Sequence, residues 1–135
     1  MSSQLNKIAD YWNQRSFGYS LDNQEELLKD QEKWIELINR YLKINKGMKV
    51  LDLGCGTGTL TVQLNNLAKT VIGVDQSETM IKKAQEQYSN IEFIVYDALV
   101  LPFESQFDVV FSNAVFHWIK DHATLLDNIH KVLKP

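Results

Sequence analysis

A short apolar segment that runs directly into a glycine-rich turn constrains this chain more than any other feature. Residues 50–58 read Val-Leu-Asp-Leu-Gly-Cys-Gly-Thr-Gly. Glycines at alternate positions allow the backbone to turn sharply and to approach a ligand with no Cβ atom in the way. The helix expected after the turn presents its free N–H groups to that ligand. The segment therefore predicts a nucleotide-like binding site at the end of a buried strand.

Composition places the chain among single globular domains. Its 135 residues are 44% hydrophobic and 23% charged, which is typical of a folded domain with a sizeable core. The net charge of −3 argues against a nucleic-acid partner held by charge. A single cysteine excludes an internal disulfide, and no segment resembles a signal peptide or a membrane span. We expect a cytoplasmic protein without membrane association.

The rhythm of the sequence changes at about residue 46. Residues 1–46 are expected to form a helical lid or cap, because apolar residues between 27 and 42, Trp34 and Tyr41 among them, recur at helical spacing. Residues 47–135 alternate short apolar strands with helices, which is typical of a doubly wound parallel sheet. The expected strands are 49–53, 70–74, 91–96 and 107–112, and the expected helices are 57–67, 78–88 (with Ser77 as N-cap) and 123–133.

The spacing of the glycines distinguishes between nucleotide ligands. Dinucleotide-binding turns use Gly-x-Gly-x-x-Gly, whereas Gly54, Gly56 and Gly58 form Gly-x-Gly-x-Gly. Thr59 stands where a dinucleotide fold has its third glycine. Asp52 adds a carboxylate at the strand end, where a pyrophosphate gains nothing from a negative charge. A ligand with a positive charge near the turn suits Asp52 better.

Residues 52–58 resemble the first motif of the class I S-adenosylmethionine-dependent methyltransferases, Asp/Glu-x-Gly-x-Gly-x-Gly, at every fixed position. Three further motifs follow in order, so that the resemblance covers residues 46–135: Gly73-Val74-Asp75, Tyr96-Asp97-Ala98 and Phe107-Asp108-Val109-Val110-Phe111-Ser112-Asn113. The resemblance implies a Rossmann-like α/β fold, S-adenosyl-L-methionine as cofactor and transfer of its methyl group. It also implies that Asp75 binds the ribose hydroxyls and that Asp97 binds the adenine amine.

The resemblance implies a wider set of cofactor-binding residues in the turn, at the strand ends and in an N-terminal aromatic segment. They are Asp52, Gly54, Cys55, Gly56, Thr57, Gly58, Asp75, Gln76, Asp97, Ala98, Asn113, Tyr11 and Tyr19. Tyr11 and Tyr19 are included because the residues around them resemble the aromatic lid of such enzymes, and we expect them to fold over the cofactor. For Asp97, a role in a surface turn alone stays open.

The fourth expected strand is followed by an aromatic segment, Asn113-Ala114-Val115-Phe116-His117-Trp118, at the carboxyl end of the sheet. His117 is the candidate general base, and the aromatic residues either wall a methyl-transfer pocket or pack in the core. The segment resembles small-molecule methyltransferases, including those that methylate carboxylic acids. It lacks the Asn/Asp-Pro-Pro-aromatic motif of amino-group DNA methyltransferases.

Other reactive residue types have ordinary structural interpretations. Cys55 is expected to pack rather than to act as a nucleophile. Asp108 is expected to support local structure, because it precedes a strand rather than ending one. His122 and His130 have no metal-ligand companions, so we expect them to be solvated and predict no metal site.

The resemblance also implies a partial sheet. The family's sheet has seven strands in the order 3-2-1-4-5-7-6, and this chain is expected to supply the part 3-2-1-4. Its apolar fourth strand would then be an open edge, through which we expect self-association. Three functions stay open: a small-molecule methyltransferase or its cofactor-binding half, a non-catalytic S-adenosylmethionine-binding or assembly module, and an NAD-dependent oxidoreductase. Asp52 and Thr59 disfavour the last.

Overall fold

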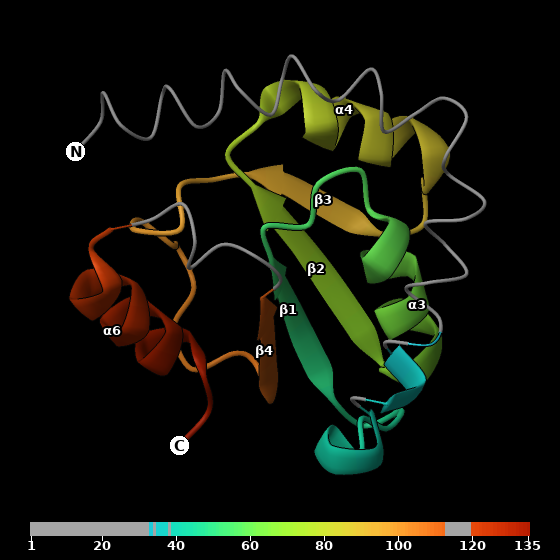
Figure 1. Ribbon diagram of the computed structural model, residues 1–135, viewed down its shortest axis with the longest axis horizontal. Helices are drawn as coiled ribbons and strands as arrows, with labels where there is room; N and C mark the ends of the chain where they lie inside the picture. The colour runs from blue at the N-terminus through green and yellow to red at the C-terminus, as the bar shows by residue number, and fades with distance from the viewer. Residues whose placement is uncertain (1–32, 34, 38, 113–119) are drawn as a thin grey trace.

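The computed structural model of the chain describes residues 33, 35–37, 39–112 and 120–135. Strands and helices alternate along these residues: β1 (Lys49–Leu53), α3 (Thr59–Leu67), β2 (Thr70–Asp75), α4 (Glu78–Gln87), β3 (Glu92–Val95), β4 (Val109–Ser112) and α6 (His122–Val132). Figure 1 shows the strands as one twisted sheet with helices packed around it. The predicted Rossmann-like α/β fold is confirmed.

The strands form a single parallel sheet in the order β3-β2-β1-β4. Asp52 of β1 lies beside Gly73 of β2 on one side and beside Phe111 of β4 on the other. Gly73 in turn lies beside Phe93 of β3. The strand order is the predicted one, and it brings the carboxyl ends of the strands together at one edge, where sheets of this kind bind ligands.

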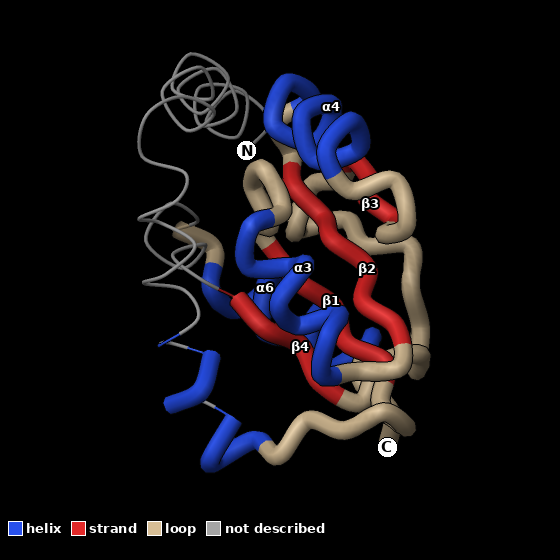
Figure 2. The backbone as a smooth tube through the Cα atoms, turned by 90° about the vertical axis from the view of Figure 1, so that its right-hand side faces the viewer, coloured by secondary structure: helices blue, strands red, loops and turns tan. Residues whose placement is uncertain are grey.

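Different helices cover the two faces of the sheet, and Figures 1 and 2 show α3 and α6 on opposite sides. In β1, Val50 packs with Leu60 of α3, whereas Leu51 and Leu53 pack with Leu125 of α6. This alternation follows from the two-residue period of a strand. Because both faces are buried, the strands are apolar along nearly their whole length.

The helix predicted at residues 57–67 begins two residues later than expected. α3 begins at Thr59 rather than at residue 57, because Gly56 and Gly58 have φ angles of 58° and 86°, which a right-handed helix does not admit. The start of α4 agrees with the prediction. Its N-cap is Ser77, whose hydroxyl accepts a hydrogen bond from the backbone N–H of Met80.

β1 agrees with the prediction at both ends, and the remaining element ends either agree or differ by one or two residues, which is usual where strands and helices end. β2 extends to Asp75, and β3 is one residue shorter at each end than predicted. β4 begins at Val109, because Phe107 forms only an isolated bridge with Leu133. α6 begins at His122, after an aspartate N-cap.

Residues 33, 35–37 and 39–42 are helical, and Ile35 among them packs in one cluster with Leu60 and Leu64 of α3. Ile35 and Ile44 are buried together with Val50 of β1, so this segment shares a core with the sheet. Tyr41, which was expected on the same apolar face, is 83% exposed. It follows Ile35 by six residues, or about 240° of helical rotation, which turns it away from the buried side. Trp34 lies outside the described residues.

Candidate functional site

The glycine-rich turn forms a compact loop between β1 and α3. The backbone N–H groups of Gly54 and Cys55 both donate to the carbonyl oxygen of Val74, at 2.7 Å and 3.0 Å, which ties the loop to the end of β2. Gly54, Gly56 and Gly58 all have positive φ angles, of 81°, 58° and 86°. A side chain at these positions would be strained, so the backbone conformation itself calls for the three glycines.

The loop glycines differ in what surrounds them. A Cβ atom at Gly56 would meet no atom within 4 Å, so the backbone there faces open space. A Cβ atom at Gly58 would lie 2.7 Å from the Cζ atom of Phe93. Gly56 therefore offers a surface that a ligand can approach, whereas Gly58 is packed against the protein interior.

The carboxyl group of Asp75 joins the end of β2 to the loop. Its Oδ2 atom accepts a 2.9 Å hydrogen bond from the N–H of Gly56, and its Oδ1 atom accepts one of 2.9 Å from the N–H of Ser77. Burial raises the pKa of Asp75, and these backbone hydrogen bonds oppose the rise. Each oxygen has the capacity to accept a second hydrogen bond, as two neighbouring ribose hydroxyls would require.

Asp52 lies beneath the loop and is 1% exposed. Its Oδ2 atom accepts a 2.7 Å hydrogen bond from the hydroxyl of Thr61 in α3. Burial raises the pKa of Asp52 to about 7; the Thr61 hydrogen bond lowers it, and the charge of Asp75 raises it further. A buried carboxyl group whose charge is destabilised by a neighbouring, half-buried carboxyl group makes a site that favours a cationic ligand.

Asp97 lies at the start of the turn that follows β3 and stabilises it by hydrogen bonds. Its Oδ1 atom accepts a 2.8 Å hydrogen bond from the N–H of Leu99, and its carbonyl oxygen accepts one from the N–H of Val100. The neighbouring Ala98 is buried against α6, and its carbonyl oxygen accepts a hydrogen bond from the side chain of Asn128. Asp97 therefore has a structural role in this turn, and its Oδ2 atom is a further acceptor for a ligand, so both interpretations of this residue stay open.

Cys55 is buried in a cluster with Ile81 and Phe93. Burial raises the pKa of its thiol well above the usual range, and the charges of Asp52 and Asp75 add to the rise. The thiol is therefore protonated at neutral pH, as expected for a packing residue rather than a nucleophile.

The remaining predicted residues fall into two groups. Thr57 is buried in the turn, and Gln76 is half-buried directly after β2. The positions of four others lie outside the described residues: Tyr11, Tyr19, Asn113 and His117.

Asp108, His122 and His130, to which we also gave ordinary roles, lie outside the loop. Asp108 supports the amino end of the sheet: its Oδ2 atom accepts a hydrogen bond from the N–H of Lys49 at 2.8 Å and lies 3.3 Å from the Nζ atom of Lys134. His122 and His130 are exposed. Across the described part of the chain, no group of three metal-ligating side chains comes together. Within the same residues, no helix is long and apolar enough to cross a membrane.

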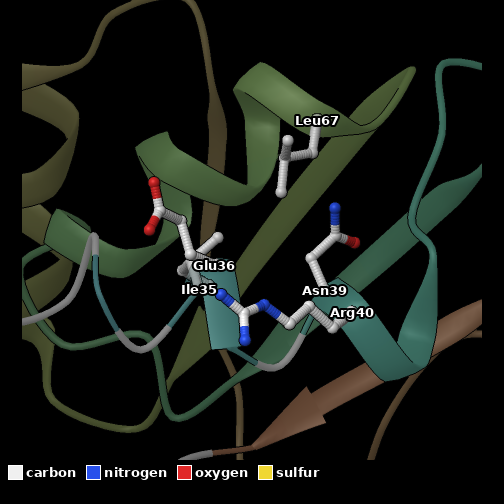
Figure 3. Close-up of a pocket in the computed structure, with 5 residues that line it drawn as sticks. All are labelled: Ile35, Glu36, Asn39, Arg40 and Leu67. Atoms are coloured by element: carbon white, nitrogen blue, oxygen red, sulfur yellow. The ribbon is translucent and has the colours of Figure 1, made fainter.

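A separate cavity of about 480 Å³ lies between the N-terminal helical residues and α3 (Figure 3). Its lining residues are Ile35, Glu36, Asn39, Arg40 and Leu67. Leu67 is the last residue of α3, whereas the glycine loop precedes the first. The cavity therefore lies at the opposite end of the helix from the loop and is not part of the candidate site.

Sequence reasoning missed three residues that the fold brings to this site. Thr61 and Phe93 gave no local signal, since one is a helical threonine and the other a strand phenylalanine. Ser112 ends the apolar strand β4, opposite Leu53, and its buried Oγ atom has no hydrogen-bond partner among the residues that the structure describes. A buried hydroxyl without a partner costs free energy, so a ligand group that hydrogen-bonds to it would be favoured.

Comparison with known proteins agrees with this geometry. A family model described as "Methyltransferase domain" matches residues 44–135. An uncharacterized methyltransferase of Schizosaccharomyces pombe is 37% identical over 133 residues, which cover 93% of this chain and 48% of the relative. The malonyl-[acyl-carrier protein] O-methyltransferase of Bacillus anthracis is 33% identical over 99 residues, 70% of this chain and 37% of that protein.

A solved structure extends the agreement to three dimensions. Phosphoethanolamine N-methyltransferase 1 of Haemonchus contortus, in complex with phosphoethanolamine and S-adenosylhomocysteine, superimposes on 97% of this chain with a TM-score of 0.78 and 25% identity. The match covers 30% of that protein, and the present chain spans about half the length, or less, of the curated relatives described above. By its motifs, its fold and these matches, the chain belongs to the class I S-adenosylmethionine-dependent methyltransferases.

Proposed function

We propose that this chain binds S-adenosyl-L-methionine at the carboxyl ends of β1, β2 and β3 and provides the cofactor side of an enzyme that methylates a small molecule. One observation carries the proposal. The N–H of Gly56, a loop residue whose backbone faces open space, donates a hydrogen bond to the half-buried carboxyl group of Asp75. This arrangement supports a ribose-binding role for Asp75, because its carboxyl group lies beside a loop backbone that a ligand can approach.

The proposed roles are those that the family resemblance implies, and the geometry of the loop and the strand ends supports them. Asp75 accepts hydrogen bonds from the ribose hydroxyls through its second lone pairs. Asp97 accepts one from the adenine amine through Oδ2. Asp52 is almost fully buried, so its negative charge favours the cofactor's ammonium and sulfonium groups through the electrostatic field of the site. The helix that begins at Thr59 favours the cofactor's carboxylate.

When bound, the cofactor supplies a methyl group attached to a positively charged sulfur. The chain has to position this group and keep the acceptor in line with it, which supplies most of the rate in such a displacement. A base is needed only where the acceptor atom carries a proton at the working pH. We keep His117 as the proposed base for such acceptors, and Tyr11, Tyr19 and Asn113 as proposed contacts of the cofactor.

A small-molecule acceptor is supported by two kinds of observation. The sequence lacks the motif of amino-group DNA methyltransferases, and its net charge is −3. Among the relatives, one is named for malonyl-acyl-carrier protein, and the structural neighbour contains phosphoethanolamine.

A single cysteine further supports a reducing compartment such as the cytoplasm.

Calorimetric titration tests cofactor binding directly. We expect saturable binding of S-adenosylmethionine and S-adenosylhomocysteine but not of NAD. Asp75→Ala should abolish binding, because it removes the ribose acceptor and releases the N–H of Gly56. Asp108→Ala is the matched control, since Asp108 also accepts a backbone N–H but lies at the amino end of the sheet. Loss of binding in both variants, or in neither, would contradict the assigned site.

Transfer of a radiolabelled methyl group separates the enzyme from a non-catalytic module. The chain, alone or joined to a further segment that completes the sheet, is expected to label a small acid or amine acceptor. Binding of S-adenosylmethionine without labelling of any acceptor under either condition would favour the non-catalytic module. Saturable binding of NAD instead would favour the oxidoreductase.

We also propose that the chain associates with itself through β4. Within the described residues, β4 pairs with β1 on one side only, and its Val109, Val110 and Phe111 are half-buried. An apolar strand edge with unpaired backbone groups favours pairing with another strand. Sedimentation at increasing concentration should show dimers or larger species, and a monomer at every concentration would contradict this proposal.

A further inference from the structure

Phe93 of β3 lies behind the glycine loop, on the side away from the open space at Gly56. It is 5% exposed and packs in one cluster with Cys55 of the loop. A Cβ atom at Gly58 would lie 2.7 Å from its Cζ atom and 3.0 Å from its Cε1 atom. The far edge of the ring therefore rests against the backbone at the start of α3.

The ring reaches the loop because the neighbouring strand has no side chain in its path. Phe93 pairs in register with Gly73 of β2. A Cβ atom at Gly73 would lie 2.6 Å from the Cδ1 atom of Phe93 and 3.0 Å from the Sγ atom of Cys55. The bare backbone of Gly73 thus lets the ring cross β2 and contact both Cys55 and Gly58.

We propose that Phe93 is a positioning residue for the cofactor: its ring fixes the glycine loop from behind and so sets the position of the Gly56 backbone and of the first turn of α3. The loop is held to two residues of β2, by two hydrogen bonds to the carbonyl oxygen of Val74 and one to the carboxyl group of Asp75. Both lie along the strand ends, whereas Phe93 supports the loop from within the core. Close packing transmits a small displacement of such a ring to the backbone that it supports.

The proposal rests on the proposed cofactor binding, so its test includes a measurement that needs no ligand. Phe93→Leu removes the Cε1 and Cζ atoms that reach Gly58 and keeps an apolar side chain. Phe103→Leu is the matched control: Phe103 is 8% exposed and packs edge-to-face on Phe107 in the core cluster on the α6 side. Both changes remove the same atoms from a buried phenylalanine, but only one of these rings touches the loop.

Amide hydrogen exchange of the unliganded chain is the first measurement. Phe93→Leu should accelerate exchange of the Gly54, Cys55 and Gly58 amides about tenfold relative to Phe103→Leu, because local opening of the loop becomes easier. Equal exchange at these amides in the two variants would overturn the proposal. If Phe93→Leu does not fold, Phe93→Met replaces it, since methionine keeps the length of the side chain but not the flat ring.

Affinity for S-adenosylhomocysteine is the second measurement, made at a temperature where both variants are folded. Phe93→Leu should raise the Kd about fivefold or more, and Phe103→Leu should leave it close to the wild-type value. An unchanged Kd in Phe93→Leu, or an equal rise in both variants, would overturn the proposal. If the wild-type chain itself fails to bind, the proposed function fails, and the exchange experiment still decides whether Phe93 fixes the loop.

Discussion

The hydroxyl of Thr61 donates a 2.7 Å hydrogen bond to the Oδ2 atom of Asp52, and both side chains are almost completely buried. The bond joins the first turn of α3 to the last residues of β1, directly beneath the glycine loop. A buried carboxyl group depends strongly on such a donor, because its ionised form has little other solvation. This pair therefore couples the stability of the loop region to the charge of Asp52.

Thr61→Val is expected to destabilise the fold by about 1–3 kcal/mol at pH 8, because the ionised carboxyl of Asp52 loses its donor in a buried position. The loss should be smaller at pH 5, where Asp52 is protonated and the hydrogen bond is not assisted by charge. Urea unfolding at the two pH values measures the difference.

Two further variants serve as controls for this prediction. Thr61→Ser keeps the hydroxyl, so its stability should be close to that of the wild type at both pH 5 and pH 8. Thr124→Val removes a comparable 2.8 Å hydrogen bond to Asp121, but this bond lies on the surface, so the free energy of unfolding should fall less than in Thr61→Val. A loss from Thr61→Val that is the same at both pH values would contradict the proposed dependence on charge.

Asp52→Asn should flatten the pH dependence of stability between about pH 4 and pH 7. Burial raises the pKa of Asp52 to about 7 in the folded chain, so the folded state binds this proton more tightly than the unfolded state. The resulting stabilisation is fully present below the unfolded pKa and is lost as the pH rises through about 7. The wild type should therefore lose up to about 4 kcal/mol relative to Asp52→Asn over this range.

Chemical unfolding at a series of pH values tests this prediction. The pKa of Asp75 is also raised by burial, and its charge raises the pKa of Asp52, so the difference between the two proteins reports Asp52 together with its coupling to Asp75. A difference in the free energy of unfolding that does not change with pH would show that Asp52 titrates alike in the folded and unfolded states.

Alanine at Gly56 and alanine at Gly58 should have different effects. At Gly56 the new methyl group meets no protein atom but requires a φ of 58°, so we expect a loss of about 1 kcal/mol in stability and a larger effect on cofactor affinity. At Gly58 the methyl group also collides with the ring of Phe93, so stability should fall further. Thermal unfolding and titration with S-adenosylhomocysteine compare the two variants, and equal losses of stability would contradict the geometry.

Asp108→Asn should instead change how the free energy of unfolding depends on pH in the acidic range. The N–H of Lys49 and the ammonium of Lys134 hold the pKa of Asp108 below its usual value. The stabilisation is present above the unfolded pKa and is lost as the pH falls through the folded pKa, which is the opposite of Asp52. The variant should lose stability at neutral pH and bind S-adenosylhomocysteine as the wild type does. Unfolding at pH 3 and pH 7 checks the sign.

Much of the fold could be predicted because its signals are local. The apolar strands, the glycine turn and the Ser77 cap each occupy a few consecutive residues, and the strand order followed from a resemblance carried by such motifs. The start of α3 was wrong by two residues, because the positive φ angles of Gly56 and Gly58 depend on how the loop closes onto Val74. The expected burial of Tyr41 was wrong for a related reason: which side of a helix is buried depends on the elements packed against it, and Tyr41 lies about 240° around the helix from the buried Ile35.

The sequence by itself determined the family, the parallel sheet and the acids at the strand ends, because each depends on the type and spacing of neighbouring residues. Only the tertiary structure decided what these residues contact. It placed the carboxyl group of Asp75 on the N–H of Gly56, the hydroxyl of Thr61 on Asp52, and the ring of Phe93 behind Gly58. These contacts join residues from different strands and helices, and their distances are set by how the strands pair and the helices pack, which no local pattern specifies.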